Sequence, residues 1–238
     1  MDEQIQQTGE SQSFSTPSYD LSVGSIIANG FSLGFKHLFA IILSFIFWAI
    51  TFWIPYVNVG TSIGLYGLVI KMAKGESFGP GEIFKKKYRA IMPEFLLLFA
   101  LFGSALALAY FFLIIPGIIL SIAWGYSFYF LIDKKLGVME SLSASNRTTY
   151  GSKWEIFGGM FIIYLIFLIF VLIVWLIFQT KPDDVFDYGG GNSLFGLGSP
   201  NIIGILLILV IYLILACVVY GAQAYVYREL SKKYETLG

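Results

Sequence analysis

The sequence predicts an all-α, polytopic membrane protein: a bundle of six transmembrane helices with cytoplasmic interfacial helices. Of the 238 residues, 57% are hydrophobic and only 13% are charged, whereas a soluble domain carries about 25% charged residues. The mean hydropathy is +0.77. The apolar residues also gather into runs of about the 17–25 residues that a helix needs to cross the hydrocarbon core of a bilayer.

The two ends of the chain differ from its apolar middle. Residues 1–20 are polar and acidic, and they lack both the basic start and the early apolar core of a cleavable signal peptide. We expect them to form a disordered cytoplasmic tail. The membrane domain is expected over residues 21–230, followed by a short cytoplasmic tail over 231–238.

The first part of the membrane domain combines an amphipathic segment with an apolar run. Residues 21–37 have helical spacing, which favours a helix lying in the membrane plane; the first turns of a longer membrane helix are the alternative. The first span is expected over 38–54, where Pro55 ends it. The apolar face of the amphipathic segment comprises Val23, Ile26, Ile27, Gly30, Phe31, Gly34 and Leu38.

The second span, expected over 59–74, is short and rich in small residues. Gly60 and Gly64 form a small-xxx-small pair on it, and such a pair allows a neighbouring backbone to approach closely. We therefore expect this span to lie inside the bundle.

A second amphipathic segment and two further spans follow. Residues 81–92 are basic on one side and apolar on the other, which predicts a second interfacial helix. The third span is expected from Pro93 to about Phe112. A tight turn at Pro116 and Gly117 is then expected to lead into the fourth span, which ends at Leu131.

The last third of the domain repeats this order. Residues 137–152 form a third amphipathic segment, and the fifth and sixth spans are expected over 154–178 and 201–227. The loop between them, 179–200, is the only long one on the side opposite the N-terminus. We interpret it as a solvated loop rather than a cation site, because the spacing of its acidic residues fits no EF-hand; those residues are Asp183, Asp184 and Asp187.

The basic residues predict the orientation. Of the 15 lysines and arginines, all but Lys181 fall on the side of the N-terminus in this arrangement. Since lysine and arginine accumulate in cytoplasmic loops, both termini are expected in the cytoplasm.

The three amphipathic segments also suggest an internal repeat. The segments 24–39, 81–95 and 139–154 each end in an aromatic residue that begins a two-span hairpin. Three such units would be related by an axis along the membrane normal. The sequence therefore predicts a three-fold repeat of one interfacial helix plus one hairpin.

Several short motifs, together with this order of segments, are similar to those of a known membrane protein family. They are Lys74-Gly75-Glu76 with Phe84, Ile115-Pro116-Gly117-Ile118, Trp124, Asp133 followed by Leu136-Gly137, Ser145, Thr149, Gly151, and Trp154, Ile156 and Phe157. With them the chain resembles, from Leu21 to Tyr227, a bacterial six-span integral membrane family of unknown function. That family includes the membrane domain of glycerophosphoryl diester phosphodiesterases. The resemblance implies the membrane fold and a bacterial inner (cytoplasmic) membrane location.

The resemblance does not bring an enzyme activity with it. The phosphodiesterases carry a separate catalytic barrel, which takes roughly 200 residues or more. This chain has no room for one. Its single histidine, His37, and its single cysteine, Cys217, cannot supply a zinc site. We expect a non-enzymatic protein with no cofactor and no metal, and zero net charge indicates no nucleic-acid partner.

The candidate binding site is a cluster of four cations on the second amphipathic segment. Cations on a cytoplasmic interfacial helix attract anionic lipid headgroups, at about 1 kcal/mol each near the surface. The alternative is that they only enforce topology. The cluster consists of Lys85, Lys86, Lys87 and Arg89.

The expected spans carry no ionisable residue near their middle, although coupled transporters usually place such groups there. Polar but uncharged side chains in the spans offer two interpretations. They line a path for a solute through the bundle, or they make interhelical hydrogen bonds. We therefore expect a protein of envelope or lipid organisation, or a membrane partner of a lipid-handling enzyme. The alternative is a transporter or channel for a small or lipidic solute. The polar side chains available for a path are Tyr110, Ser121, Tyr126, Ser127, Tyr164 and Gln223.

Overall fold

The structure is a computed structural model that describes residues 21–178 and 201–237. Within these ranges every regular element is a helix. The N-terminal tail and the acidic loop expected over 179–200 lie outside the described residues. The all-α class expected from composition is confirmed for the described part of the chain.

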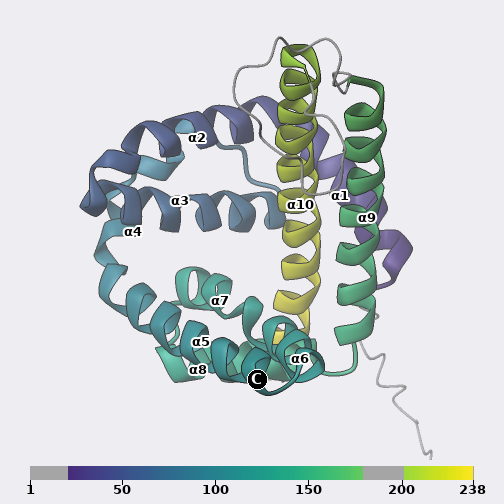
Figure 1. The fold of residues 1–238 in the computed structure, drawn as a ribbon. Coiled ribbons are helices and arrows are strands. Elements are labelled where there is room, and N and C mark those ends of the chain that lie inside the picture. The colour runs from purple at the N-terminus through teal and green to yellow at the C-terminus, as the bar shows by residue number, and fades with distance from the viewer. Residues whose placement is uncertain (1–20, 179–200, 238) are drawn as a thin grey trace, which may run out of the picture.

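Three helical hairpins dominate the fold (Figure 1). In each, an apolar helix is followed by a partner that returns beside it, and the three hairpins are arranged around the centre of the molecule. The helices of the hairpins are α2 (Leu38–Ile50) with the 3₁₀ turn η1 (Thr51–Trp53) and α3 (Pro55–Ala73); α5 (Met92–Phe112) with α6 (Ile114–Gly125) and α7 (Ser127–Lys134); and α9 (Lys153–Phe178) with α10 (Ile202–Leu237).

Four of the described segments are long and apolar enough to cross a membrane. They are Met92–Phe112, Ile114–Lys134, Lys153–Phe178 and Ile202–Leu237. A fifth is present if the helix pair Val23–Lys36 and Leu38–Trp53, bent by 74°, counts as one span. The chain is therefore a multi-pass helical membrane protein. Large apolar side chains lie exposed along α5, α9 and α10, as expected for faces that meet lipid rather than water.

Helix α3, which corresponds to the second predicted span, is not among these segments. Its glycines and polar residues lower its hydropathy, and it lies deep in the molecule, with Ile63 and Leu68 fully buried. The expected close approach at Gly64 is present, because a Cβ added there would lie 2.5 Å from the Ile83 Cα. The neighbour, however, is the connecting segment after α3 and not a membrane helix.

The predicted amphipathic segments differ from one another. The first forms α1 (Val23–Lys36) and the third forms α8 (Val138–Thr149). The second is not one helix, as predicted, but a 3₁₀ helix η2 (Pro80–Phe84) and a single turn α4 (Lys86–Ala90). Lys85 between them is extended (φ −62°, ψ 136°), and the preceding residues turn inward to bury Glu82 and Ile83.

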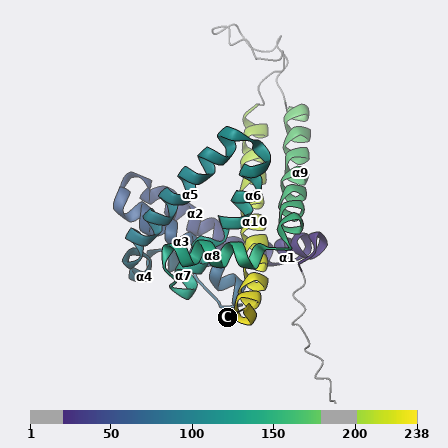
Figure 2. The same cartoon turned by 90° about the horizontal axis from the view of Figure 1, so that it is seen from below.

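Each amphipathic segment packs against a helix that ends a hairpin. The contacts pair η2 with α3, α8 with α6 and α7, and α1 with α10. The pairing of α1 with α10 joins the beginning of the described chain to its end. Figure 2 shows α5–α6 and α9–α10 projecting to one side, whereas α1, α8 and the C-terminal end of α10 lie toward the other.

Glycines make the contact between α1 and α10 a backbone contact. A Cβ added at Gly34 would lie 2.6 Å from the Cys217 carbonyl oxygen, and one added at Gly221 would lie 2.3 Å from the Gly30 carbonyl oxygen. No side chain fits at such distances. The face of α1 that includes Ile26 therefore packs on protein, whereas the amphipathic pattern alone suggested that it lies on lipid.

The expected position of the turn before the fourth span is corrected by the structure. The hairpin turn before the fourth span lies at Leu113, which is extended, and not at Pro116 and Gly117. Proline is tolerated in the first turn of a helix, where its missing N–H has no intrahelical partner. At the other end, α10 continues to Leu237 through residues expected to form a tail, and it buries Leu230.

Candidate functional site

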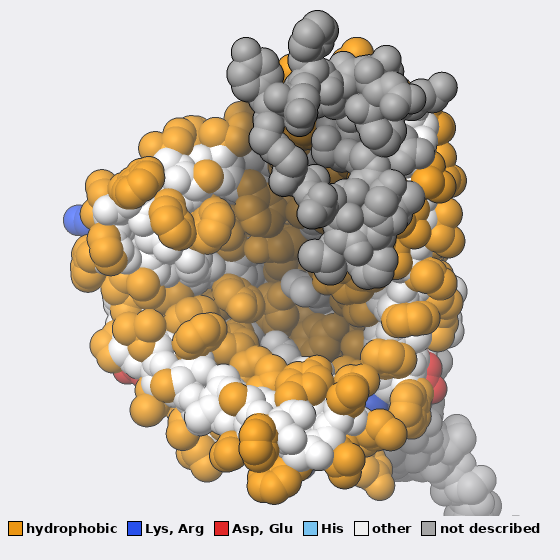
Figure 3. All heavy atoms as spheres, viewed as in Figure 1, with side chains coloured by type: hydrophobic (Ala, Val, Ile, Leu, Met, Phe, Trp, Pro, Cys, Tyr) orange, Lys and Arg blue, Asp and Glu red, His pale blue; other side chains and the backbone are white. Residues whose placement is uncertain are grey.

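A cavity with a volume of about 510 Å³ lies between the three hairpins. Each hairpin contributes to its wall: Trp48 and Tyr66 come from the first, Ser121 from the second, and Gln223 from the third. Figure 3 shows the hollow from one side, lined mainly by hydrophobic side chains. A pocket of this size and lining is typical of sites for apolar small molecules.

Aromatic rings form the wall of the cavity where α3 meets α7. The Tyr66 ring lies 5.3 Å from the Phe128 ring and 5.4 Å from the Tyr129 ring, measured between centroids. The Phe95 ring lies 5.6 Å from the Tyr66 ring and 5.2 Å from the Phe128 ring. Because these rings interlock in tilted or edge-on contacts, which stabilise aromatic pairs, they make this wall a continuous layer.

Hydrogen bonds between and within the hairpins fix some of the polar groups of the cavity. The Tyr129 hydroxyl donates to Gln223 Oε1 at 2.6 Å, which connects the second and third hairpins. Trp48 Nε1 donates to Ser62 Oγ at 2.8 Å within the first hairpin. Both polar pairs are therefore held in place beside apolar walls.

Three tyrosines on the cavity wall have hydroxyl groups that are available for hydrogen bonds with a ligand. Tyr126, Tyr164 and Tyr220 line the cavity, and none of the hydrogen bonds among the described residues uses their hydroxyl groups. A tyrosine hydroxyl in such a place usually has a partner. The cavity thus combines an apolar interior with hydroxyl groups that a ligand can use.

The structure brings together most of the polar residues that the sequence offered for a path. Ser121, Tyr126, Tyr164 and Gln223 line the cavity. Ser127 instead donates to the Trp124 carbonyl oxygen at 2.6 Å, and Tyr110 is exposed beside Gly117. Sequence reasoning missed other residues of the wall, because aromatic residues in apolar spans look alike whichever way they face; these are Trp48, Tyr66, Tyr129 and Tyr220.

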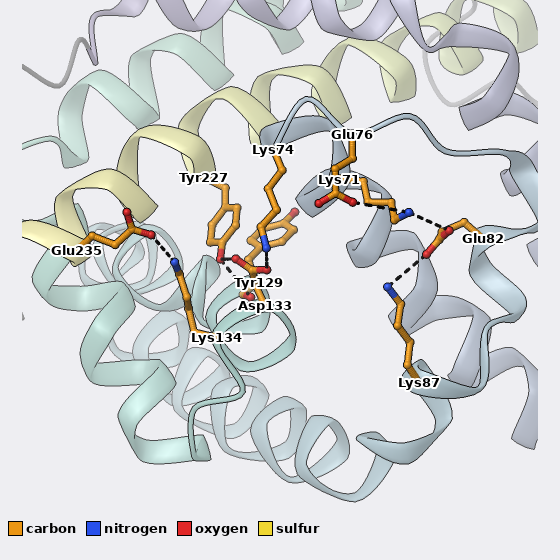
Figure 4. Close-up of polar contacts among 10 residues, drawn as sticks. All are labelled: Lys71, Lys74, Glu76, Glu82, Lys87, Tyr129, Asp133, Lys134, Tyr227 and Glu235. Carbon is orange, nitrogen blue, oxygen red and sulfur yellow. Dashed lines mark hydrogen bonds and ion pairs between the residues drawn. The ribbon is translucent and has the colours of Figure 1, made fainter.

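A second polar site, away from the cavity, surrounds the buried Glu82 on η2 (Figure 4). Its carboxylate oxygens lie 3.2 Å from Lys71 Nζ, 2.7 Å from Lys85 Nζ and 3.3 Å from Lys87 Nζ. Burial alone would raise the pKa of Glu82, but hydrogen bonds from the three lysines outweigh it and lower that pKa to about 2. Glu82 is therefore a carboxylate at any physiological pH.

The predicted basic cluster is divided around this carboxylate. Lys85 and Lys87 turn toward Glu82, whereas Lys86 is exposed and makes no hydrogen bond or ion pair with the described residues. The aliphatic part of Arg89 covers Gly60, because a Cβ added at Gly60 would lie 2.7 Å from Arg89 Cγ. The four cations share one segment but not one function in the fold.

Polar contacts also join the last helices of the three hairpins (Figure 4). Asp133 on α7 accepts hydrogen bonds from Lys74, just after α3, and from the Tyr227 hydroxyl on α10, the latter at 2.8 Å. The Asp133 side chain is only 5% exposed. Nearby, Lys134 pairs with the exposed Glu235 at 2.6 Å. Asp133 is thus the one described carboxylate that contacts all three of these helical ends.

The described residues contain no group of three or more His, Cys, Asp or Glu side chains that could hold a metal ion. No known protein family matches the sequence, and neither a curated protein nor a solved structure is similar enough to count as a match.

Proposed function

We propose that this chain is a non-enzymatic integral membrane protein that binds the apolar part of a lipid between its three hairpins. In this role it organises lipid in the bacterial inner membrane or assists a lipid-handling enzyme there. The cavity of about 510 Å³, shared by all three hairpins, carries the proposal. Its walls are mainly apolar and aromatic, and the outer faces of α5, α9 and α10 are also apolar, which suits an acyl chain.

The proposal includes the arrangement of the chain in the membrane. We take α2 and α3 as two short spans that complete six, with both termini and the basic residues in the cytoplasm. The three units are a repeat of one amphipathic segment and one hairpin, as the sequence pattern suggests. Support comes from the cyclic packing, in which η2, α8 and α1 each contact the helix that ends another unit's hairpin.

Anionic headgroups would contact the basic segment that contains Lys85, Lys86, Lys87 and Arg89. Lys86 supports this assignment best, because it is exposed and has no ion-pair partner among the described residues. Lys85 and Lys87 remain more than half exposed while they contact Glu82. A cation of this kind near a membrane surface contributes about 1 kcal/mol of attraction to anionic lipid.

A glycine pair provides the test of lipid binding in the cavity. A Cβ added at Gly125, in the cavity wall, or at Gly103, on the outer face of α5, meets no atom within 4 Å. Gly125→Phe should fill the cavity without a clash, and Gly103→Phe is its matched control. Native mass spectrometry of protein released from lipid nanodiscs counts the lipids that stay bound. We expect Gly125→Phe to lose a bound lipid that wild type and Gly103→Phe retain; equal retention by all three would refute the proposal.

Transport of a small or lipidic solute is the second candidate function. The hydroxyl groups of Tyr126 and Tyr164, together with Ser121 on the same wall, favour it, because they offer polar contacts to a passing headgroup. Proteoliposomes with fluorescent lipid in both leaflets would show transport as lipid that becomes accessible to an external quencher. Transport that Gly125→Phe abolishes and Gly103→Phe leaves intact would favour this candidate over static lipid binding.

A further inference from the structure

A second, smaller cavity of about 170 Å³ lies next to the central one and has a different character. It continues along the same faces of α3 and α7. Ile70 stands one helical turn beyond Tyr66, and Asp133 stands one turn beyond Tyr129. Tyr66, Phe128 and Tyr129 belong to the wall of the central cavity and not to that of the small one. The small cavity therefore lies at the lysine-rich end of these helices, and it shares no lining residue with the central one.

Cations outnumber anions in the wall of this cavity. Its four lysines face two carboxylates, those of Glu76 and Asp133, across apolar side chains that include Ile70. Figure 4 shows the arrangement: Lys74 with Asp133 on one side, and Lys71 and Lys87 with Glu82 on the other. The four lysines are Lys71, Lys74, Lys87 and Lys135.

The four lysines differ in their exposure and in the carboxylates that they contact. Lys71 is only 17% exposed and contacts both Glu76 and Glu82, and Lys74 is paired with Asp133. Lys87 is 56% exposed and lies 3.3 Å from Glu82, a carboxylate that Lys71 and Lys85 also contact. Lys135 is exposed and has no hydrogen bond or ion pair among the described residues. Lys87 and Lys135 can therefore turn toward a ligand without leaving a carboxylate unpaired.

The backbone at Lys135 adds an independent observation. Lys135 has φ +55° and ψ +36°, the left-handed conformation, and among the described residues it is the only non-glycine with a positive φ. At the end of a helix this conformation normally belongs to glycine, because a Cβ makes it less favourable. A lysine at this position places a cation on the rim of the cavity at a cost that a glycine would avoid.

We propose that this cavity, between Lys71, Lys74, Lys87 and Lys135, is a binding site for a phosphate group. The phosphate belongs either to an anionic phospholipid headgroup or to a soluble phosphate compound. Lysine ammonium groups bind phosphate through charge-assisted hydrogen bonds. The Tyr88 hydroxyl and the apolar wall of Ile70, Ile91 and Ile132 limit the space around the phosphate. The proposal does not depend on lipid binding in the central cavity.

The test compares two double variants that remove the same charge. Lys87→Gln with Lys135→Gln takes two cations from the cavity rim, whereas Lys36→Gln with Arg147→Gln takes two exposed cations outside both this cavity and the basic segment. Binding of inorganic phosphate is measured by calorimetry. Retention of phosphatidylglycerol over phosphatidylcholine is measured by native mass spectrometry from nanodiscs. We expect the rim variant to lose about 30-fold in affinity, since each lysine near an anionic group contributes about a factor of five, and the control to keep wild-type affinity.

The outcomes separate the two sources of phosphate and leave the proposal open to refutation. Phosphatidylglycerol retained in excess inorganic phosphate identifies a lipid headgroup, whereas phosphate binding without lipid preference identifies a soluble compound. Equal loss in both double variants, or no binding of either probe to wild type, would overturn the proposal. The single variant Lys135→Gln tests the site without a risk of misfolding, because this lysine has no partner to lose among the described residues. Gly125→Phe, in the central cavity, should leave phosphate binding unchanged.

Discussion

The contact between α1 and α10 and the space between the hairpins are opposite solutions to helix packing. At the α1–α10 contact, glycines let two backbones approach until no Cβ fits between them. Between the hairpins, Tyr66, Phe128 and Tyr129 hold the helices apart and leave a cavity of about 510 Å³. The comparison shows how one chain builds both a rigid junction and an open site. Small residues in the spans mark the junction, and aromatic residues mark the site.

The largest expected effect comes from forcing α1 and α10 apart at their tight contact. Gly34→Leu places a side chain where even a Cβ would lie 2.6 Å from the Cys217 carbonyl oxygen. The backbones must separate, so the free energy of unfolding should fall by about 3 kcal/mol or more. Gly24→Leu is the control on the same helix, because a Cβ there meets no atom within 4 Å. Thermal unfolding in detergent measures both, and equal stability of the two variants would contradict the tight junction.

The next effect concerns the buried carboxylate of Glu82. Its pKa is lowered from 4.5 to about 2, so its contribution to stability is complete above pH 4.5 and is lost as the pH falls toward 2. The shift corresponds to about 3 kcal/mol at most. Glu82→Gln should remove this contribution at neutral pH. Unfolding measured from pH 7 to pH 2 should show the difference between wild type and Glu82→Gln vanishing at the acid end; a constant difference would rule out the linkage.

A smaller effect distinguishes buried from exposed charge at the ends of the hairpins. Asp133→Asn removes the charge that Lys74 and Tyr227 contact, and it should lower the free energy of unfolding by about 2 kcal/mol. Glu235→Gln breaks an ion pair whose carboxylate is 64% exposed, and it should change stability by less than about 1 kcal/mol. Chemical denaturation of both variants gives the comparison. A larger loss from Glu235→Gln would mean that Asp133 does not join the three helical ends.

The sequence predicted the features that depend on composition and periodicity. The apolar runs at 93–112, 154–178 and 201–227 were expected to form spans, and they correspond to the long helices Met92–Phe112, Lys153–Phe178 and Ile202–Leu237, because hydropathy over such lengths is a strong signal. The close approach at Gly64 was also expected, but not its neighbour, since a small residue reveals that something approaches and not what it is. The break in the helix at Lys85 was not predicted. The basic residues around Lys85 fit the pattern of an exposed helix, and this pattern does not indicate that Glu82 is buried.

The cavity could not be predicted for a related reason. In a hydrophobic span, the pattern of apolar residues does not tell a lipid-facing side from a cavity-facing one. Tyr66 and Tyr220 therefore looked like any other aromatic residue of a span. Lysines also have several uses at one end of a bundle, as topology signals, ion-pair partners or ligand contacts. Only the fold shows that Lys71 and Lys87 share Glu82, whereas Lys135 has no partner among the described residues.

The most direct test of the central claim is an experimental structure of the protein in a membrane that contains phospholipids with brominated acyl chains. The lipid-binding account expects bromine density between the hairpins, within the cavity bounded by Trp48, Ser121 and Gln223. It also expects an unbroken aromatic layer at Tyr66 and Tyr129. Bromine confined to the outer faces of α5 and α9, with the hairpins closed on one another, would contradict the account.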